Sequence, residues 1–293
     1  MAKSENEEKV RLRFINNYDN NSYYMRRITM KKYFFGLLCA IIVTCIVCIY
    51  CVGGQVGAYT WNIAVLIFAP VTIFLILVQI IILIVALCKG KKVSWNIVFI
   101  AISIVFALPI TVLLGVSPVA YPTNASTNDS ITVTMPIENA VIFGGSEYKT
   151  HSMWPSECYA YDILKEPYNV ESSNLQDYGI FGEDIISPVK GRVIGIENNE
   201  QDIIPNTEEF TSSLGNYIFI KIDEINTYLI LAHLMQDSIE VSVGEQIDIG
   251  DVIGKVGNSG TTSEPHLHIQ HQRNNPLETK FPVCAEGLPI TFK

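Results

Sequence analysis

The chain has 293 residues, enough for one large domain or two smaller ones. About 49% of the residues are hydrophobic, only 17% are charged, and the mean hydropathy is positive. This composition excludes a disordered chain and is typical of a protein with membrane-embedded segments. The formal net charge of −9 argues against a nucleic-acid partner, because binding to nucleic acid needs a basic surface.

The charges are distributed unevenly along the chain. Residues 1–32 contain eight Lys or Arg side chains, whereas residues 33–116 contain no Asp or Glu and only three lysines. Most of the acidic residues follow Val116. The sequence therefore predicts a basic cytoplasmic tail at 1–32, a membrane domain at 33–116 and an acidic soluble domain beyond it.

Three long apolar runs lie inside the predicted membrane domain. A helix rises about 1.5 Å per residue, so roughly 20 residues cross the ~30 Å hydrocarbon core of a bilayer. All three runs reach that length, and they carry too little polar surface for three helices that face water. They predict three transmembrane α-helices at residues 33–52, 63–88 and 97–116.

The loops between these runs predict the orientation. The tail at 1–32 and the second loop, 89–96, are basic, whereas the first loop, 53–62, is uncharged. The positive-inside rule places the tail and the second loop in the cytoplasm. Three crossings then place the C-terminal domain outside the cell, with Tyr59 and Trp61 as anchors at the outer interface and Trp95 at the inner one. Three spans exceed what an anchor requires, which leaves a membrane partner protein as an open question.

The rest of the chain is predicted to be a linker at 117–135 and a β domain at 136–293. Short β-branched or alternating runs recur between glycine-containing turns, and no long amphipathic helix interrupts them. The fold class is therefore three transmembrane helices followed by an all-β, antiparallel, extracellular domain. Cys158 and Cys284 are the two cysteines of this domain, and the sequence leaves open whether they pair.

All five histidines of the chain follow residue 150. His266 and His268 form an H-x-H pair on a predicted strand, where side chains alternate, so both lie on one face. Two imidazoles on one face suit a zinc site. His233 and Asp162 each lie in an otherwise apolar strand and are either satisfied core residues or part of a site. His271 has the opposite parity and is interpreted as a surface residue at the strand end.

Several segments of the β domain together match a family. Residues 257–268 (GNSGTTSEPHLH), 231–234 (LAHL) and 159–162 (YAYD) resemble the lysostaphin-type, LytM-like zinc endopeptidases of bacteria. Segments 187–193, 214–217, 243–254 and 286–292 extend the resemblance over roughly residues 136–293. The resemblance implies a β fold of the duplicated-hybrid-motif kind, a Zn²⁺ cofactor and a peptidoglycan peptide as substrate.

The resemblance also implies which residues hold zinc. The family has a His, an Asp and the second His of H-x-H as ligands, which places Asp162 and His268 in the last two positions. The usual first motif has its His four residues before the Asp, where this chain has Cys158. A variant of the family carries the His further upstream, so His151 becomes the first ligand, and a Cys158 thiolate remains the alternative.

The two remaining histidines take the catalytic roles that the resemblance implies. His233 and His266 flank the attacking water, and we expect them to orient it and to stabilise the oxyanion of the tetrahedral intermediate. The three protein ligands leave one position on zinc open for water or a substrate carbonyl. The predicted function is hydrolysis of peptide bonds in peptidoglycan stem peptides or cross-bridges by a membrane-anchored enzyme.

Two other functions are compatible with parts of the sequence. Some members of the family have lost zinc ligands and act by binding the cell wall or by activating another wall hydrolase. Because only the first histidine is displaced here, the sequence favours an active enzyme. The segment 243–254 also resembles a lipoyl or biotin carrier hairpin, but Lys255 lacks the neighbouring Met of such carriers.

Overall fold

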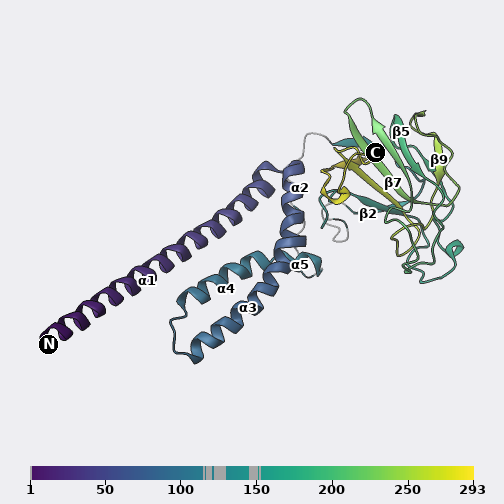
Figure 1. Ribbon diagram of the computed structural model, residues 1–293. Coiled ribbons are helices and arrows are strands. Elements are labelled where there is room, and N and C mark those ends of the chain that lie inside the picture. Colours follow the sequence, from purple (N-terminus) through teal and green to yellow (C-terminus); the bar gives the residue numbers. More distant parts are fainter. Residues whose placement is uncertain (1, 115, 117–120, 122–129, 145–150, 152) are drawn as a thin grey trace. The chain divides into compact units, whose positions relative to one another are not determined.

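A computed structural model describes residues 2–114, 116, 121, 130–144, 151 and 153–293, with side chains from residue 25 onward (Figure 1). The chain forms two compact units. One consists of residues 1–47 with 67–109, and the other of residues 48–66 with 110–293.

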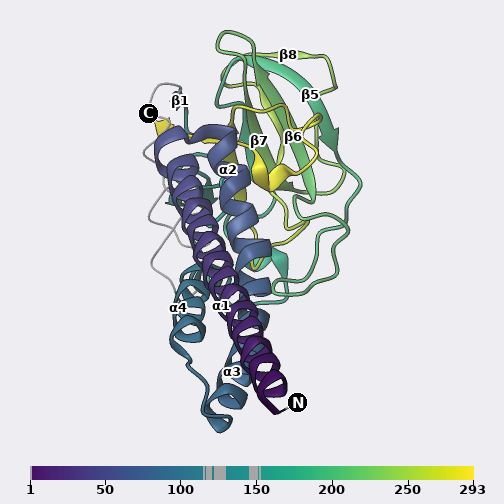
Figure 2. The same cartoon turned by 60° about the vertical axis from the view of Figure 1, so that its left-hand side comes forward.

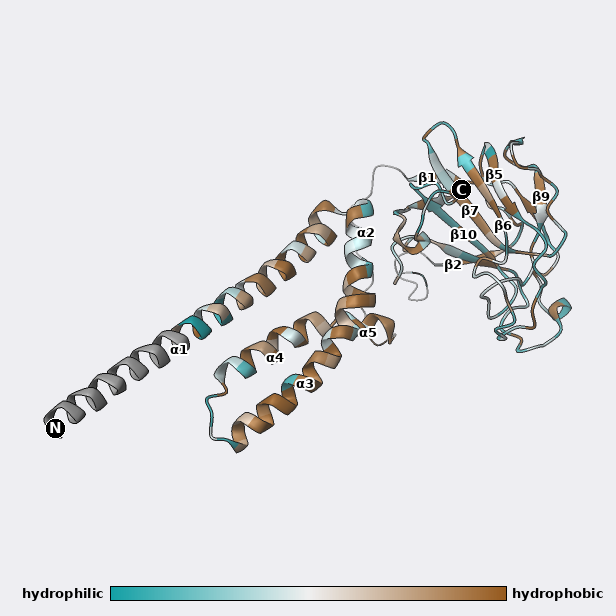
Figure 3. Cartoon of the chain, in the orientation of Figure 1, coloured by the Kyte–Doolittle hydropathy of each residue, from teal (hydrophilic) through white to brown (hydrophobic). Residues whose placement is uncertain are grey.

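The first unit is helical. Its elements are α1 (Ala2–Val47), α3 (Ala69–Cys88) and α4 (Ser94–Ala107). α3 packs along α4, where the Gln79 side chain donates to Ser103 Oγ at 3.0 Å, and α1 contacts α4 through Phe34 and Phe99. Most residues of α3 and α4 are hydrophobic (Figure 3), and many of their apolar side chains are exposed. Such a surface is unfavourable in water and suits a lipid environment.

Two helical stretches are long and apolar enough to cross a membrane, by length and composition, among the described residues. They are Met25–Val52 and Gly54–Cys88. The third predicted span is helical as α4, which ends at Ala107, and continues after Pro109 only as the short α5 (Ile110–Leu113). α4 by itself would be about 21 Å long, less than the ~30 Å of a hydrocarbon core. A third crossing therefore stays a prediction.

The segment 53–62 is a helix and not the loop that the sequence predicts. It forms α2 (Gly54–Ile63), between the π-helical turns η1 (Cys48–Val52) and η2 (Ala64–Phe68). The break before it lies at Gly53 and Gly54, whose φ angles of 64° and 53° suit glycine. Lack of charge predicts a translocated loop, but the chain is helical after the two glycines and continues from α2 through η2 into α3.

The expected interfacial role of Trp61 is not what the structure gives it. The Trp61 side chain is 6% exposed, and its indole N–H donates to the carbonyl oxygen of Met153 at 2.9 Å. The ring packs edge-on against Tyr121, with 5.6 Å between ring centroids. α2 therefore belongs to the second unit, where it packs on the β domain.

The second unit contains the β domain. Its strands are β1 (Ile131–Val133), β2 (Val141–Gly144), β3 (Tyr161–Leu164), β4 (Asp184–Ile186), β5 (Gly191–Glu197), β6 (Asn216–Ile222), β7 (Thr227–Leu234), β8 (Gln246–Ile247), β9 (Val252–Lys255), β10 (Leu267–Gln272), β11 (Gly287–Leu288) and β12 (Ile290–Phe292). Two 3-10 turns, η4 (Leu175–Asp177) and η5 (Pro282–Cys284), lie between them. The main sheet has the order β2-β3-β10-β7-β6-β5-β8, with β11 beside β10, and all its pairs are antiparallel. Figure 2 shows β7, β6 and β5 side by side in this sheet.

The hydrophobic core lies between the main sheet and the two small sheets, β4–β9 and β1–β12. Leu267 and Ile269 of β10 point into it, as their alternation with the histidines predicts. The β1–β12 pair is parallel, so the domain is mostly but not entirely antiparallel. β1 lies within the predicted linker 117–135, because Ile131 and Val133 fill the core beside β12. Residues 117–120 and 122–129 of that linker lie outside the described residues.

Candidate metal centre

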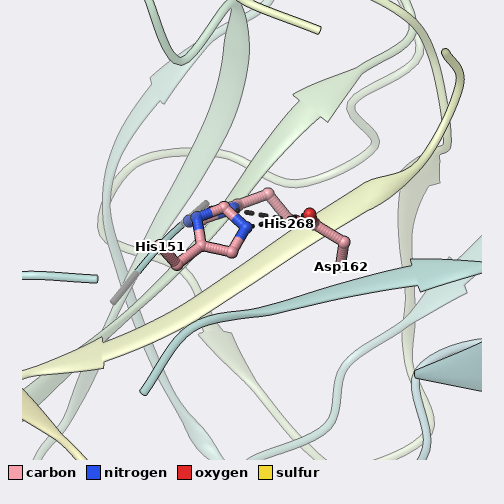
Figure 4. Close-up of side chains that lie close together, drawn as sticks. All are labelled: His151, Asp162 and His268. Carbon is pink, nitrogen blue, oxygen red and sulfur yellow. Dashed lines mark hydrogen bonds and ion pairs between the residues drawn. The ribbon is translucent and has the colours of Figure 1, made fainter. Parts of the chain in front are cut away.

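The register between β3 and β10 places two of the predicted ligands opposite each other. Asp162 and His268 are direct partners in this antiparallel pair, so their side chains leave the sheet on the same face. His151 joins them, and one potential ligand atom from each of the three residues lies within 4.8 Å of the others (Figure 4). Residues distant in sequence therefore form one buried cluster.

His151 reaches this cluster from outside the strands, at the start of a series of turns. The chain between His151 and β3 makes three successive tight turns, in which Trp154 N–H bonds to His151 O, Glu157 N–H to Trp154 O and Ala160 N–H to Glu157 O. His151 Nε2 lies 2.8 Å from Asp162 Oδ2, and Nδ1 lies 3.4 Å from Glu157 Oε2. Because of these turns, His151 contacts Asp162 although it lies eleven residues before it in the sequence.

The electrostatics of the cluster keep Asp162 ionised. Burial by itself would raise the pKa of this carboxyl group, but the surrounding His266, His151 and His268 lower it well below its usual range. Conversely, burial lowers the pKa of His151, but its bonds to Asp162 and Glu157 outweigh burial and raise it to about 9. The centre is therefore an anionic carboxylate surrounded by imidazoles, and a cation can replace the His151 proton.

The ring of His268 is oriented by a chain of amide side chains. His268 Nε2 donates to Gln270 Oε1 at 3.0 Å, which leaves Nδ1 facing Asp162 Oδ1 at 3.3 Å. Gln270 Nε2 in turn donates to Gln272 Oε1, and Gln272 Nε2 donates to Asn274 O. Such outer partners fix which nitrogen of a histidine can bind a metal. Sequence reasoning missed Gln270, although its parity on β10 places it on the face of His268.

His233 enters the site through a β-bulge. Asn216 pairs with Leu234 and Tyr217 pairs with Ala232, so His233 is an extra residue between two ladder positions. Its φ angle is 65°, in the left-handed region that non-glycine residues rarely adopt. In a regular strand it would point to the face opposite Ala232, into the core. The bulge turns it toward His266, with 4.7 Å between the ring centroids.

His233 and His266 are held in the same tautomer. His233 Nδ1 donates to Ser259 O and His266 Nδ1 donates to Glu264 O, both at 2.8 Å. Burial lowers the pKa of both imidazoles, for His266 against the opposing pull of Asp162. Both rings are therefore neutral, and Nε2 of each is the atom that can accept a proton. His266 Nε2 lies 3.5 Å from Asp162 Oδ1, at the edge of the cluster.

Two residues considered from the sequence lie elsewhere. Cys158 is buried among apolar side chains, where its Sγ–H donates to Pro155 O and burial raises its pKa to about 12. Cys158 and Cys284 are both free thiols. His271 is not a surface residue, because it is 1% exposed and its Nε2 lies 2.7 Å from Thr227 Oγ1. His271 has the parity opposite to that of His268, as predicted, but β11 and the chain after it cover that end of the strand.

The donor set fits zinc. Two imidazole nitrogens and one carboxylate are the kinds of ligand that catalytic zinc sites use, and three protein ligands leave a position for water or substrate. All three side chains are buried, and partners in the protein orient them. The five predicted site residues therefore lie together, around one carboxylate.

Residues 176–278 match the family model described as Peptidase family M23. The chain carries an M23 peptidase domain. The matched residues include His233, His266 and His268 and begin after Asp162, and they make up about a third of the chain. Among curated protein sequences, none matches the chain.

Similar solved structures have low overall similarity to the whole chain. The catalytic domain of the antimicrobial peptidase lysostaphin from Staphylococcus simulans is 19% identical, over 44% of this chain and 74% of that one, with a TM-score of 0.30. A zinc-containing peptidase from Vibrio cholerae is 26% identical over 31% and 24% of the two chains, with a TM-score of 0.24. A putative peptidase M23 from Pseudomonas aeruginosa is 18% identical over 56% and 53%, with a TM-score of 0.29.

The strained backbone at His233 generates a test that is independent of activity. Both His233→Ala and His233→Gly remove the imidazole, but only glycine adopts a φ of 65° without steric cost. We expect the Gly variant to be more stable than the Ala variant by about 1 kcal/mol. The measurement is the free energy of unfolding in urea, on the detergent-solubilised full chain. Equal stability of the two variants would show that His233 carries no backbone strain.

Proposed function

We propose that the chain is a membrane-anchored, zinc-dependent endopeptidase that hydrolyses peptide bonds in bacterial peptidoglycan. The observation that carries this proposal is the convergence of His151, Asp162 and His268 into one buried cluster, with His233 and His266 beside it. The M23 domain supports a peptidase, and members of this family usually act on peptidoglycan. Stem peptides and cross-bridges are both compatible substrates.

In this proposal, His151 Nε2, an oxygen of Asp162 and His268 Nδ1 hold the metal. When bound, zinc supplies Lewis acidity that polarises a carbonyl and lowers the pKa of water to about 7. His268 is kept in place by Gln270, and Glu157 orients His151 from its other nitrogen. Cys158 is an unsuitable alternative ligand, since its raised pKa keeps it a thiol and metals bind thiolates.

His233 and His266 have the properties of proton acceptors. Both are neutral, and both have Nδ1–H bonded to a backbone carbonyl, so each can accept a proton at Nε2 from an attacking water. The resulting N–H groups can then stabilise the charge that develops on the substrate carbonyl oxygen. The site uses burial to keep these rings neutral while the carboxylate beside them stays ionised.

The alternative is a family member without activity that binds the wall or activates another hydrolase. A chain that had lost its metal would lack at least one ligand side chain in the cluster. Here the displaced histidine returns to Asp162 through the turns that follow it. The contact between His151 and Asp162 therefore favours an active enzyme over an inactive wall-binding member.

We also propose the topology predicted from the loops, with a cytoplasmic tail at 1–32 and the β domain outside the cell. The acidic β domain, the basic tail and the two long apolar helical stretches support it. A third crossing within residues 97–116 is part of this proposal, since two crossings would return the β domain to the cytoplasm, away from peptidoglycan.

The test of the zinc centre uses the full chain in detergent. His268→Ala should lose zinc and release no peptide fragments from purified peptidoglycan, because one of three ligands is missing. His233→Ala should keep zinc and lose at least about a hundredfold in rate, as expected for a general base. Zinc content and the masses of released fragments are the measurements.

The matched control is His271→Gln, on the same strand but on the opposite face, which should keep both zinc and activity. Wild-type protein that binds the wall without zinc and without products would instead establish the inactive wall-binding member. Normal cleavage by His233→Ala would remove His233 from the catalytic role.

The test of topology uses epitope tags at the two ends of the chain in intact cells. An odd number of crossings places the ends on opposite sides, so antibody should reach only the C-terminal tag. Permeabilised cells are the control, in which both tags should react. Protection of both tags in intact cells would exclude the third crossing and the extracellular domain.

A further inference from the structure

We infer that helix α2 positions the first metal ligand, with Trp61 as the positioning residue. The inference rests on the proposed zinc site and adds to it a structural link between α2 and His151. Asp162 and His268 are fixed by the pairing of β3 with β10, whereas His151 lies outside any strand, at the start of the tight turn that Trp154 N–H closes on His151 O. The position of His151 therefore depends on what holds that turn.

α2 holds the turn directly. The Trp61 indole N–H donates to the carbonyl oxygen of Met153, two residues after His151 and inside the tight turn that starts there. The adjacent Asn62 side chain donates to the carbonyl oxygen of Val283 in η5 at 3.1 Å. Two neighbouring residues of α2 thus bind two separate segments of the β domain, which fixes the helix against both.

Apolar packing reinforces these two bonds. The buried members of this cluster come from α2 and its flanking turns, from α5, from the segment before β3 and, for Tyr121, from the chain between α5 and β1; they are Ile49, Trp61, Val65, Val112, Tyr121 and Cys158. Met153 and Tyr159 pack against it. The chain between His151 and Asp162 therefore lies with its apolar side on α2 and its two ligand side chains in the metal cluster.

This arrangement couples the α2 helix, which continues into a candidate membrane span, to the metal site. A shift of α2 would move the Met153 carbonyl and, with it, the His151 ring. Residues that orient a metal ligand typically change metal affinity about 10- to 100-fold when they are replaced. Trp61 acts on zinc only through His151, because the indole bonds to the backbone of the ligand-bearing turn.

The experiment measures zinc affinity of the full chain in detergent, by competition with a chelating dye. Trp61→Ala should weaken zinc binding at least about tenfold. Trp61→Phe keeps most of the packing but loses the N–H, and should give an intermediate loss. Tyr59→Ala, on the exposed side of α2, is the matched control and should stay within about twofold of wild type.

The visible spectrum of the Co²⁺-loaded protein separates positioning from general destabilisation. Loss of the His151 ligand changes the spectrum of the folded, loaded protein, whereas lower stability alone does not. Wild-type affinity together with a wild-type spectrum in Trp61→Ala would overturn the inference and leave the proposed function standing. A wild-type chain that binds neither Zn²⁺ nor Co²⁺ would overturn both.

A separate observation concerns the helical unit. A pocket of about 730 Å³ lies between α1, α3 and α4, at the end where α3 turns into α4. Five cationic side chains and one indole line it: Arg27, Lys31, Lys89, Lys91, Lys92 and Trp95. The described residues of its lining include no carboxylate. Five like charges around one pocket repel each other, and a bound anion would relieve that repulsion.

We propose that this pocket binds the phosphate group of an anionic phospholipid. Arg and Lys are the side chains that bind phosphate, and basic pockets between helices on the cytoplasmic side of membranes bind such head groups. Ile82, Val85 and Ala86 of α3 also line the pocket and are apolar. A phospholipid can use both the charges and these apolar side chains, whereas a free phosphate ion can use only the charges.

Adjacent pairs of cations on α1 provide a matched test. Arg27→Gln with Lys31→Gln removes two lining charges, while Arg26→Gln with Lys32→Gln removes two charges that do not line the pocket. Binding of phosphatidylglycerol to the full chain in neutral detergent is measured by native mass spectrometry. The first pair should weaken binding roughly tenfold, and the second should weaken it less than about twofold.

Two outcomes would overturn this second proposal. Equal weakening by both pairs would mean that the basic segment attracts the lipid as a whole, without a site. Displacement of the lipid by an equal concentration of inorganic phosphate would make a soluble anion the ligand.

Discussion

The pairing of β3 with β10 is the constraint on which the candidate site depends. It places the Asp162 carboxylate directly opposite His268, in the middle of a sheet whose other face is the hydrophobic core. A buried carboxylate is costly unless charges or hydrogen bonds compensate it. The imidazoles of His151, His266 and His268 surround the Asp162 carboxylate and keep its pKa low. The sheet register and the electrostatics therefore favour the same arrangement, a carboxylate that a cation can share with histidines.

His233 enters the site through a departure from regular strand geometry. His233 is the extra residue of a bulge with positive φ, held by bonds from its N–H to Leu214 O, from Gly257 N–H to its carbonyl and from its ring to Ser259 O. Strain of this kind persists only where the surroundings over-determine it, and it is found often at functional sites. In the proposed enzyme, the bulge removes a polar ring from the core and places it beside His266.

The two units of the chain differ in the polarity of their surfaces. α3 and α4 expose long apolar side chains, while the β domain has its apolar residues inside and carries most of the acidic ones. α2 is the element that does not follow this division. It continues into an apolar helix, yet its Trp61 and Asn62 bind the backbone of the β domain. The proposed role of α2 follows from these bonds, because His151, the proposed first ligand, starts the turn that Trp61 holds.

Much of this protein could be predicted from the sequence, for physical reasons that act locally. Strand alternation places His266 and His268 on one face and Leu267 and Ile269 in the core, and charge distribution separates an apolar helical part from an acidic β part. Other features depend on contacts between distant segments and were decided only by the tertiary structure. Alternation sends His233 into the core, but the bulge opposite Asn216 reverses it. An uncharged segment predicts a loop at 53–62, but the structure forms the helix α2 there, and its Trp61 and Asn62 side chains bind the backbone of the β domain. The choice between His151 and Cys158 could not be made from spacing, because it depends on which side of the turn faces α2 and which faces Asp162.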